Sequence, residues 1–218
     1  MGQNSILNVK QKLILNEFKQ DDRLSSSFYF TGGTALSEFY LKHRVSIDLD
    51  FFSQKTFNSQ LVMEIIESWS YKYKFSIRTQ FIDPTYNYFL NFSDGQILKL
   101  DFARYPYKQL EKERIVDGLR IDSKFDIAVN KLLTTNQRSE VKDYVDLYFL
   151  MKTFNFWQLR DGAKIKFNIE IEPFIAATDF MKVDDFEILP MMHKKLSLET
   201  LKAFFKTQSK ILGLTSIR

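Results

Sequence analysis

Hydrophobic residues recur along the chain at two spacings, and each spacing predicts a different kind of element. Apolar side chains three or four positions apart indicate amphipathic helices, whereas alternation of apolar and polar side chains indicates strands with one buried face. The helical spacing predicts helices over 4–20, 34–42, 58–72, 124–136, 139–153, 155–167, 172–182 and 197–212. Alternation and aromatic content predict strands over 28–30, 46–52, 74–82, 86–92 and 96–105.

The order of these elements changes near residue 120. Before it, strands alternate with helices, and Ser93-Asp94-Gly95 is a hairpin signal between the last two strands. After it, the pattern is helical, and Ser123 is a plausible N-cap for the first helix. The fold class that follows is α+β: a mixed sheet flanked by helices over 1–118, then a helical domain over 119–218.

Composition narrows the classes of protein without choosing among them. The 218 residues are 44% hydrophobic and 27% charged, which is typical of a soluble globular protein. There is no Cys, so disulfides, thiolate chemistry and cysteine zinc sites are excluded. The first residues show no signal-peptide pattern and no long apolar run follows, so we expect no membrane span and a cytoplasmic protein.

Charge and aromatic content permit a nucleic-acid partner but do not require one. Lys and Arg number 31 against 27 Asp and Glu, a net charge of +4 that would favour phosphates only mildly. Most of the 22 Phe and 10 Tyr residues are expected to fill the core. Exposed ones could stack on bases.

Two aspartates on one predicted strand are the first candidates for chemistry. Asp48 and Asp50 alternate with Ile47, Leu49 and Phe51, so both fall on the polar face of strand 46–52, with Cα atoms roughly 6.6 Å apart. Such a pair is usually a solvated face. Carboxylates at this spacing can also converge on Mg²⁺ or Mn²⁺, which relieves their mutual repulsion.

A glycine turn precedes the acidic strand. Gly32 and Gly33 stand between a predicted strand and a predicted helix, where the lack of side chains lets backbone N–H groups approach phosphate oxygens. Thr34 would add a hydroxyl to that cradle. A glycine pair before a helix is more often plain turn chemistry, so the turn has weight only together with the aspartates.

Asp101 is the natural third carboxylate. It alternates with Leu98 and Leu100 on strand 96–105, so it points away from the leucine face. Its expected role is to hold the metal and to activate the attacking hydroxyl, by direct contact or as a base. Arg104 follows on the same strand and faces either a nucleotide or the surface.

These residues resemble a known family. Gly32-Gly33, the helix and Asp48-Leu49-Asp50 look like the signature of the DNA polymerase β-like nucleotidyltransferase superfamily. More specifically, TGGTALSEFYLKHRVSIDLDFF, residues 31–52, resembles the first motif of the AbiEii-type nucleotidyltransferases, toxins of type IV toxin–antitoxin and abortive-infection systems. The resemblance includes Arg44 as a candidate phosphate ligand. For the adjacent His43 we expect an exposed or capping role.

A second resemblance lies in the helical half. DIAVNKLLTTNQRSEVKDYVDLYFL, residues 126–150, is similar to the later motifs of the same family. It implies that Lys131 contacts the triphosphate of the incoming nucleotide, and that Asp146, with Asp143, lies near the attacking hydroxyl or orients the lysine. Taken alone, these residues would be expected to form a surface salt-bridge network. Residues 155–218 carry no motif that we recognise.

The resemblance implies a metal-dependent transfer of a nucleoside monophosphate from an NTP to an acceptor hydroxyl. It implies Mg²⁺ or Mn²⁺ as cofactor, tRNA or another RNA as acceptor, and a cognate antitoxin as partner. The alternative is a non-catalytic nucleotide- or RNA-binding protein with a nucleotidyltransferase-like fold. If Asp101 pointed away from Asp48 and Asp50, this alternative would be preferred.

Overall fold

The computed structural model describes residues 5–215, and the chain divides into two compact units. Each unit is built from segments that are separated in the sequence. Unit 1 takes in the chain up to Phe39, Ser46–Lys108 and Glu113–Asp122, and unit 2 takes in Tyr40–Val45, Gln109–Lys112 and the chain from Ser123 onward. The division expected at 118/119 lies just before Ser123.

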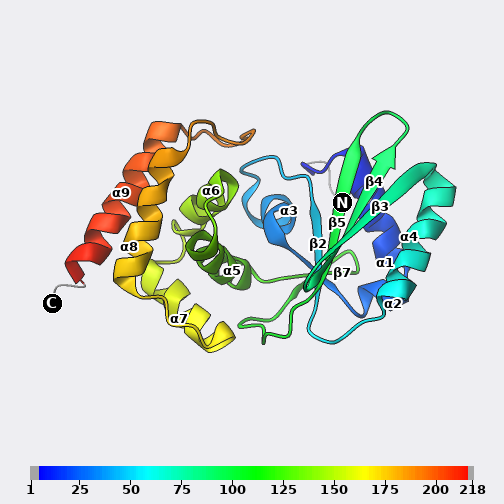
Figure 1. Cartoon of the computed structure of the whole chain (residues 1–218), viewed down its shortest axis with the longest axis horizontal. Coiled ribbons are helices and arrows are strands. Elements are labelled where there is room, and N and C mark those ends of the chain that lie inside the picture. Colours follow the sequence, from blue (N-terminus) through cyan, green and yellow to red (C-terminus); the bar gives the residue numbers. More distant parts are fainter. Residues whose placement is uncertain (1–4, 216–218) are drawn as a thin grey trace. The chain divides into compact units, whose positions relative to one another are not determined.

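Unit 1 is organised around a seven-stranded mixed sheet in the order β3-β4-β5-β2-β1-β7-β6 (Figure 1). Pairings β2–β5 and β1–β7 are parallel, and the other pairings are antiparallel. The strands are β1 Tyr29–Thr31, β2 Leu49–Ser53, β3 Phe75–Ile82, β4 Thr85–Phe92, β5 Ile97–Arg104, β6 Arg114–Val116 and β7 Leu119–Ile121. The predicted fold class, a mixed sheet flanked by helices and followed by a helical region, is confirmed.

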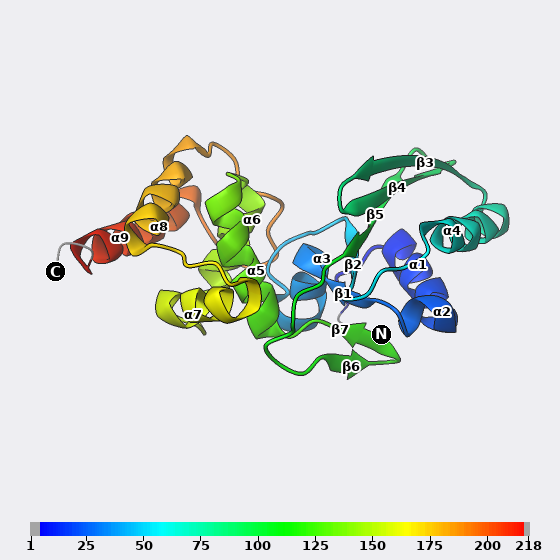
Figure 2. The ribbon, with the colours of Figure 1, turned by 60° about the horizontal axis from the view of Figure 1, so that its bottom comes forward.

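One face of the sheet packs into an aromatic core. The rings of Phe18 and Phe51 stack with centroids 4.1 Å apart, and Phe51 and Phe102 stack at 5.0 Å. Helices α1 Val9–Gln20, α2 Asp22–Ser25 and α4 Ser59–Tyr73 lie on this side (Figures 1 and 2). Part of the high Phe content is therefore core, as expected from burial of large apolar rings.

Unit 2 is helical. Its elements are α5 Lys124–Gln137, α6 Val141–Leu150, α7 Phe156–Phe167, α8 Pro173–Met181, a 3-10 turn Lys182–Asp185 and α9 Leu198–Thr215. The rings of Tyr144, Phe180 and Phe205 meet edge to face in the core, with centroids about 5 Å apart. The predicted cap is present, because the Ser123 side chain accepts a hydrogen bond from the Asp126 backbone N–H.

A buried ion pair anchors the short segment Gln109–Lys112 within unit 2. Lys166 Nζ lies 2.7 Å from Asp126 Oδ1, and both side chains are fully buried. The Asp126 carboxylate also accepts hydrogen bonds from the backbone N–H groups of Leu110 and Glu111 at 3.0–3.1 Å. These donors and Lys166 offset the cost of burying the carboxylate.

The structure corrects three expectations about elements. The strand expected over 46–52 begins only at Leu49, so Asp48 precedes it. The helix expected over 34–42 starts at the glycine turn as α3 Gly32–Leu36 and continues as the π-helical turn Ser37–Leu41. The β6–β7 hairpin was missed, because its strands are too short to show alternation. No helix among residues 5–215 is long and apolar enough to cross a membrane.

Candidate functional site

The glycine turn and the acidic strand are in direct contact. Gly32 follows β1 with φ at +74°, and a Cβ at this position would lie 2.0 Å from Asp50 Oδ2. Only glycine fits, because both the backbone conformation and the close carboxylate exclude a side chain. The Thr34 hydroxyl donates to the Asp48 backbone carbonyl at 2.5 Å. The turn thus positions the Asp50 carboxylate.

Asp50 and Asp101 are direct neighbours on the polar face of the sheet. Strands β2 and β5 run parallel with Asp50 opposite Asp101, so both side chains emerge on the face opposite Phe51 and Leu100. Asp48 and Asp50 are half-buried, and Asp101 is 9% exposed. Asp101 therefore emerges on the same sheet face as Asp50.

Two residues that the sequence did not single out hold Asp101. Asn87 Nδ2 donates to Asp101 Oδ1 at 2.7 Å from β4, and Lys99 Nζ lies 2.5 Å from Asp101 Oδ2 on the same strand. Lys99 could have been found, since it precedes Asp101 by two positions and shares its face. Asn87 could not, because its partner depends on the register between β4 and β5.

The donor set fits a hard divalent cation. Carboxylate oxygens are the ligands that Mg²⁺ and Mn²⁺ prefer. The Asp50 carboxylate lies directly against the glycine turn at Gly32, where phosphate oxygens could approach the backbone. Asp48, Asp50 and Asp101 are not gathered into a ready-made metal site, since residues 5–215 contain no group of three or more His, Cys, Asp or Glu side chains that could hold a metal ion. Lys99 and a cation would compete for the same Asp101 oxygen.

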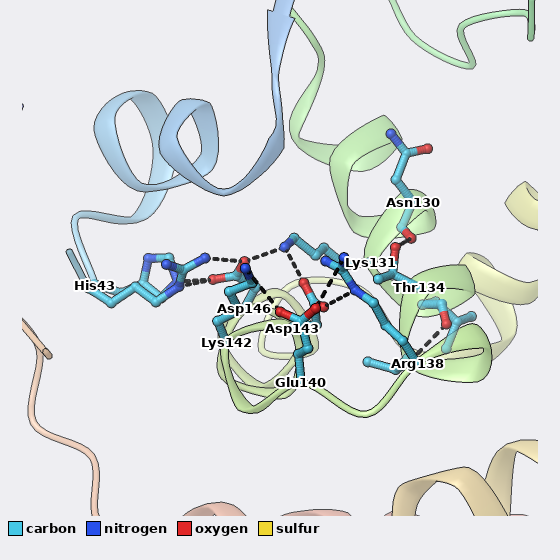
Figure 3. Close-up of polar contacts among 12 residues, drawn as sticks. His43, Asn130, Lys131, Thr134, Arg138, Glu140, Lys142, Asp143 and Asp146 are labelled. Atoms are coloured by element: carbon cyan, nitrogen blue, oxygen red, sulfur yellow. Dashed lines mark hydrogen bonds and ion pairs between the residues drawn. The ribbon is translucent and has the colours of Figure 1, made fainter. Parts of the chain in front are cut away.

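The predicted residues of the helical half form a buried ionic cluster in unit 2 (Figure 3). Asp146 on α6 is fully buried and receives Arg44 through both oxygens, at 2.7 Å from Nε and 2.8 Å from Nη2. His43 Nε2 lies 2.7 Å from Asp146 Oδ1, and Lys131 Nζ lies 2.7 Å from Asp146 Oδ2. An ionised carboxylate only accepts, so the imidazole donates from Nε2.

Asp143 completes the ionic cluster one turn earlier on α6. It is fully buried, with Oδ1 2.6 Å from Lys131 Nζ and Oδ2 2.9 Å from Arg138 Nε. Lys131 therefore lies between two carboxylates, whereas Arg138 reaches Asp143 from a half-exposed position. The surface salt-bridge network that these residues suggest in isolation is instead a buried one.

Burial and charge oppose one another within this ionic cluster, and charge wins for its ionised members. Burial alone would raise the pKa of Asp146, but Lys131 and Arg44 hold that pKa well below its usual range. Burial opposes the charge of Lys131 too, yet Asp146 and Asp143 raise the Lys131 pKa. For His43 burial prevails and lowers the pKa of the imidazole, although Asp146 accepts its hydrogen bond and favours the charged form. The imidazole is thus neutral while the carboxylates stay ionised.

Three expectations about neighbouring residues need revision or refinement. His43 is not exposed but fully buried, because its ring fills the space beside Phe149 and its Nε2 serves Asp146. Arg44 has Nε and Nη2 on Asp146 and Nη1 on the Val45 carbonyl, so its guanidinium is committed within unit 2. Arg104 is exposed at the end of β5 and lies on the sheet face opposite Asp101.

Comparisons with known proteins identify the family and the fold. The family model described as "Nucleotidyl transferase AbiEii toxin, Type IV TA system" matches residues 14–188. A protein of Aquifex aeolicus (strain VF5), described as uncharacterized, is 34% identical over 146 residues. That match covers 65% of this chain and 66% of the relative, slightly less than two thirds of its length.

Two solved structures share the fold. JHP933 from Helicobacter pylori is 22% identical with a TM-score of 0.59, over 96% of this chain and 94% of that one. MenT4, a nucleotidyltransferase toxin from Mycobacterium tuberculosis H37Rv, is 16% identical with a TM-score of 0.57, over 92% of this chain and 82% of that one. At these identities the likeness concerns the fold alone.

Proposed function

Because the chain belongs to the AbiEii family of nucleotidyl transferase toxins of type IV toxin–antitoxin systems, we propose that it transfers a nucleoside monophosphate from an NTP to an RNA hydroxyl. The observation that carries the proposal is the meeting of Gly32, Asp50 and Asp101 on one sheet face. Phosphoryl transfer needs a backbone turn that can bind phosphate next to carboxylates that can hold a metal ion.

In this proposal each part of unit 1 has a defined task. Asp48, Asp50 and Asp101 would hold Mg²⁺ or Mn²⁺, which when bound neutralises phosphate charge and lowers the pKa of the attacking hydroxyl. Backbone N–H groups of Gly32 and Gly33, with the Thr34 region, would orient the NTP phosphates. The acceptor oxygen forms a bond to the α-phosphorus, the bond to the β-phosphate oxygen breaks, and pyrophosphate leaves with that electron pair.

The proton of the attacking hydroxyl needs a nearby acceptor. Asp101 is our candidate for this acceptor. Its Oδ1 is held by Asn87, and its Oδ2 is held by Lys99, whose departure would leave a lone pair of that oxygen open to the proton. Lys99, now on Asp101, would be released towards phosphate when a cation takes its place. These steps make Asn87 and Lys99 positioning residues for Asp101.

The role of Lys131 and Asp146 is best described as positioning within unit 2. Asp146 is saturated by donors, which supports the part of the prediction in which it orients the lysine rather than touching the attacking hydroxyl. Contact between Lys131 and the triphosphate stays a prediction. So do tRNA as the acceptor, the cognate antitoxin and a cytoplasmic location.

A transfer assay tests the proposal. The protein is incubated with Mg²⁺, total tRNA and each of the four labelled NTPs, and labelled RNA and protein are then separated. We expect label in RNA from the wild type and a loss of about a hundredfold or more for Asp48→Ala with Asp50→Ala, as several kcal/mol of charge stabilisation implies. Equal incorporation by both proteins would refute the catalytic assignment.

A control at a surface carboxylate tests whether loss of negative charge by itself lowers transfer. Asp94 lies in the β4–β5 turn with its side chain 47% exposed and pairs with Lys10. Asp94→Ala is expected to transfer at the wild-type rate. A non-catalytic nucleotide-binding protein would instead show thermal stabilisation by NTP with Mg²⁺ and no transfer by any variant.

A further inference from the structure

The polar face of the sheet continues beyond the carboxylates across β4 and β3. In β3, Ser76, Arg78 and Gln80 are exposed, and their neighbours Phe89 and Asn91 in β4 are half-buried. Ile82 at the end of β3 and Ile97 at the start of β5 are each 58% exposed. The apolar core and helices α1 and α4 lie on the opposite side of these strands (Figure 2). This side of β5, β4 and β3 is therefore open to a ligand.

Cross-strand register arranges the open face in two rows. The first row runs from Gln80 through Asn87 and Asp101 to Asp50. The second row runs from Arg78 through Phe89 to Lys99, each two residues away from its neighbour in the first row on the same strand. We call this second row the Arg78–Phe89–Lys99 strip. Neighbours on one strand face are about 6.6–6.8 Å apart, so the strip lies directly beside the proposed reaction site.

The chemistry of the strip differs from that of an ordinary solvated strand. The Arg78 guanidinium carbon lies 3.8 Å from the centroid of the Phe89 ring. Lys99 lies on the other side of Phe89 in the register, with its side chain 29% exposed. A ring flanked by two cations on adjacent strands offers a stacking surface for bases and positive charge for phosphates. An apolar partner would leave both cations desolvated without compensation.

We propose that the Arg78–Phe89–Lys99 strip binds a single-stranded segment of the RNA acceptor next to the hydroxyl that is modified. One base stacks against the Arg78–Phe89 pair, and the flanking phosphates contact Arg78 and Lys99. The inference rests on the proposed function, because it assigns the acceptor of that reaction a place on the same sheet face. It gives a binding role to Arg78 and Phe89, which take no part in the proposed chemistry, and a second role to Lys99 once a cation has replaced it on Asp101.

Direct binding tests the strip without turnover. Labelled tRNA and a labelled single-stranded oligoribonucleotide are titrated with protein by fluorescence anisotropy, without NTP or divalent cation and at several salt concentrations. Phe89→Leu is expected to raise Kd roughly tenfold for both RNAs, from the loss of one stacked base. Arg78→Gln is expected to raise Kd and to reduce the slope of log K against log salt by about 0.7, one phosphate contact.

Arg23→Gln is the matched control. Arg23 is also an exposed arginine of unit 1, but it belongs to α2 and pairs with Asp21 on the core side of the sheet. This variant is expected to keep the wild-type Kd and salt slope. If Phe89→Leu fails to fold, Arg78→Gln decides, because its exposed polar replacement leaves the core intact. Thermal unfolding of each variant checks folding.

The outcomes separate the strip from the proposed chemistry. Wild-type Kd and salt slope in both strip variants would overturn the inference, as would absence of RNA binding by the wild type. RNA binding that weakens in the strip variants, without any transfer of label by the wild type, would support the strip and refute the transferase proposal. With an active wild type, strip variants should raise KM for RNA and leave KM for NTP unchanged.

Discussion

Two pairs of aspartates, one at the start of strand β2 and one on helix α6, have opposite environments. Asp48 and Asp50 lie half-buried beside the glycine turn, and Asp50 is on a sheet face that continues into exposed strands. Asp143 and Asp146 are fully buried on α6 and receive hydrogen bonds and ion pairs from Arg44, His43, Lys131 and Arg138. Both pairs match family motifs, yet only the first is partly exposed to solvent, which is why we propose it as the ligand-binding pair.

The surroundings of an aspartate decide whether its carboxylate is available for chemistry or stabilises the fold. A carboxylate surrounded by buried cations is locked in its ionised form, and it cannot take a new partner without leaving those cations uncompensated. A carboxylate at a partly hydrated sheet face keeps that capacity. The shared motif does not distinguish these cases, whereas the burial of each carboxylate does.

The most severe test of the comparison removes the centre of the ionic cluster. Asp146→Ala leaves Arg44 and Lys131 buried with a lost partner, so we expect the free energy of unfolding to fall by about 3–5 kcal/mol. In the matching experiment on the other pair, Asp48→Ala should change the free energy of unfolding by about 1 kcal/mol or less while abolishing transfer. Urea unfolding of both variants measures this. Similar stability losses in the two would remove the distinction.

The next test concerns the glycine that holds Asp50. Gly32→Ala must accommodate a Cβ against the Asp50 carboxylate at a positive φ, whereas Gly95→Ala meets only the positive φ, with nothing within 4 Å of its Cβ. The Gly95 change should cost about 1–2 kcal/mol in unfolding free energy. Gly32→Ala should cost about 1–3 kcal/mol more, since the strand must shift.

Gly32→Ala should also abolish transfer, because Asp50 would be displaced. Gly95→Ala should transfer at the wild-type rate after correction for the folded fraction. The two variants therefore share backbone strain and differ in the carboxylate contact. Equal transfer rates for the folded proteins would show that the contact between Gly32 and Asp50 has no part in the reaction.

A graded test uses pH. The His43 pKa is lowered from 6.5 by burial, so the unfolded chain binds the proton first and stability falls as pH drops below 6.5. The lowered pKa values of Asp143 and Asp146 add a further loss below 3.8. On the alkaline side, the raised Lys131 pKa makes stability fall as pH rises above 10.5.

His43→Gln isolates the first of these losses. Unfolding free energies measured between pH 7 and pH 5 should slope less steeply for this variant, by at most about 1.4 kcal/mol per pH unit for one proton. Its stability at pH 7 will also change, so the slope is the diagnostic quantity. Parallel slopes in the two proteins would mean that His43 does not remain neutral in the folded protein.

The smallest effect compares the two cations on Asp143. Arg138 has its side chain 50% exposed, whereas that of Lys131 is 10% exposed. Arg138→Gln should lower the unfolding free energy by about 0.2–1 kcal/mol, and this loss should shrink in high salt. Lys131→Gln should cost more and respond less to salt, because solvent ions reach it poorly. Equal salt dependence would contradict the buried character of the Lys131 pair.

Periodicity along the sequence predicts most helices and strands and places Asp101 on the polar face of β5. Helix α4 and strands β3 to β5 fall within a residue or two of their predicted bounds, since their apolar patterns are long and regular. The hairpin β6–β7 escapes, because three-residue strands carry little pattern.

Burial of the ionic cluster could not be foreseen from single residues. His43 precedes a charged, motif-bearing segment and looks like a surface histidine until Asp146, far along the chain, is known to be its partner. Asn87 is likewise defined only by its register against Asp101. Periodicity reports which face a residue occupies, whereas partners across the chain depend on tertiary packing.

The interleaving of the two units has a consequence for fragments of this protein. A fragment beginning at Ser123 would lack His43 and Arg44, and with them two of the partners of Asp146. It would also lack Leu110 and Glu111, whose backbone N–H groups satisfy Asp126. Truncation at Ser123 therefore removes buried hydrogen-bond partners of Asp146 and Asp126 from unit 2. The two halves of a split chain should regain structure only when they are mixed. Unfolding of unit 2 should depend on Tyr40–Val45 and Gln109–Lys112, the two segments of this unit that precede Ser123 in the sequence.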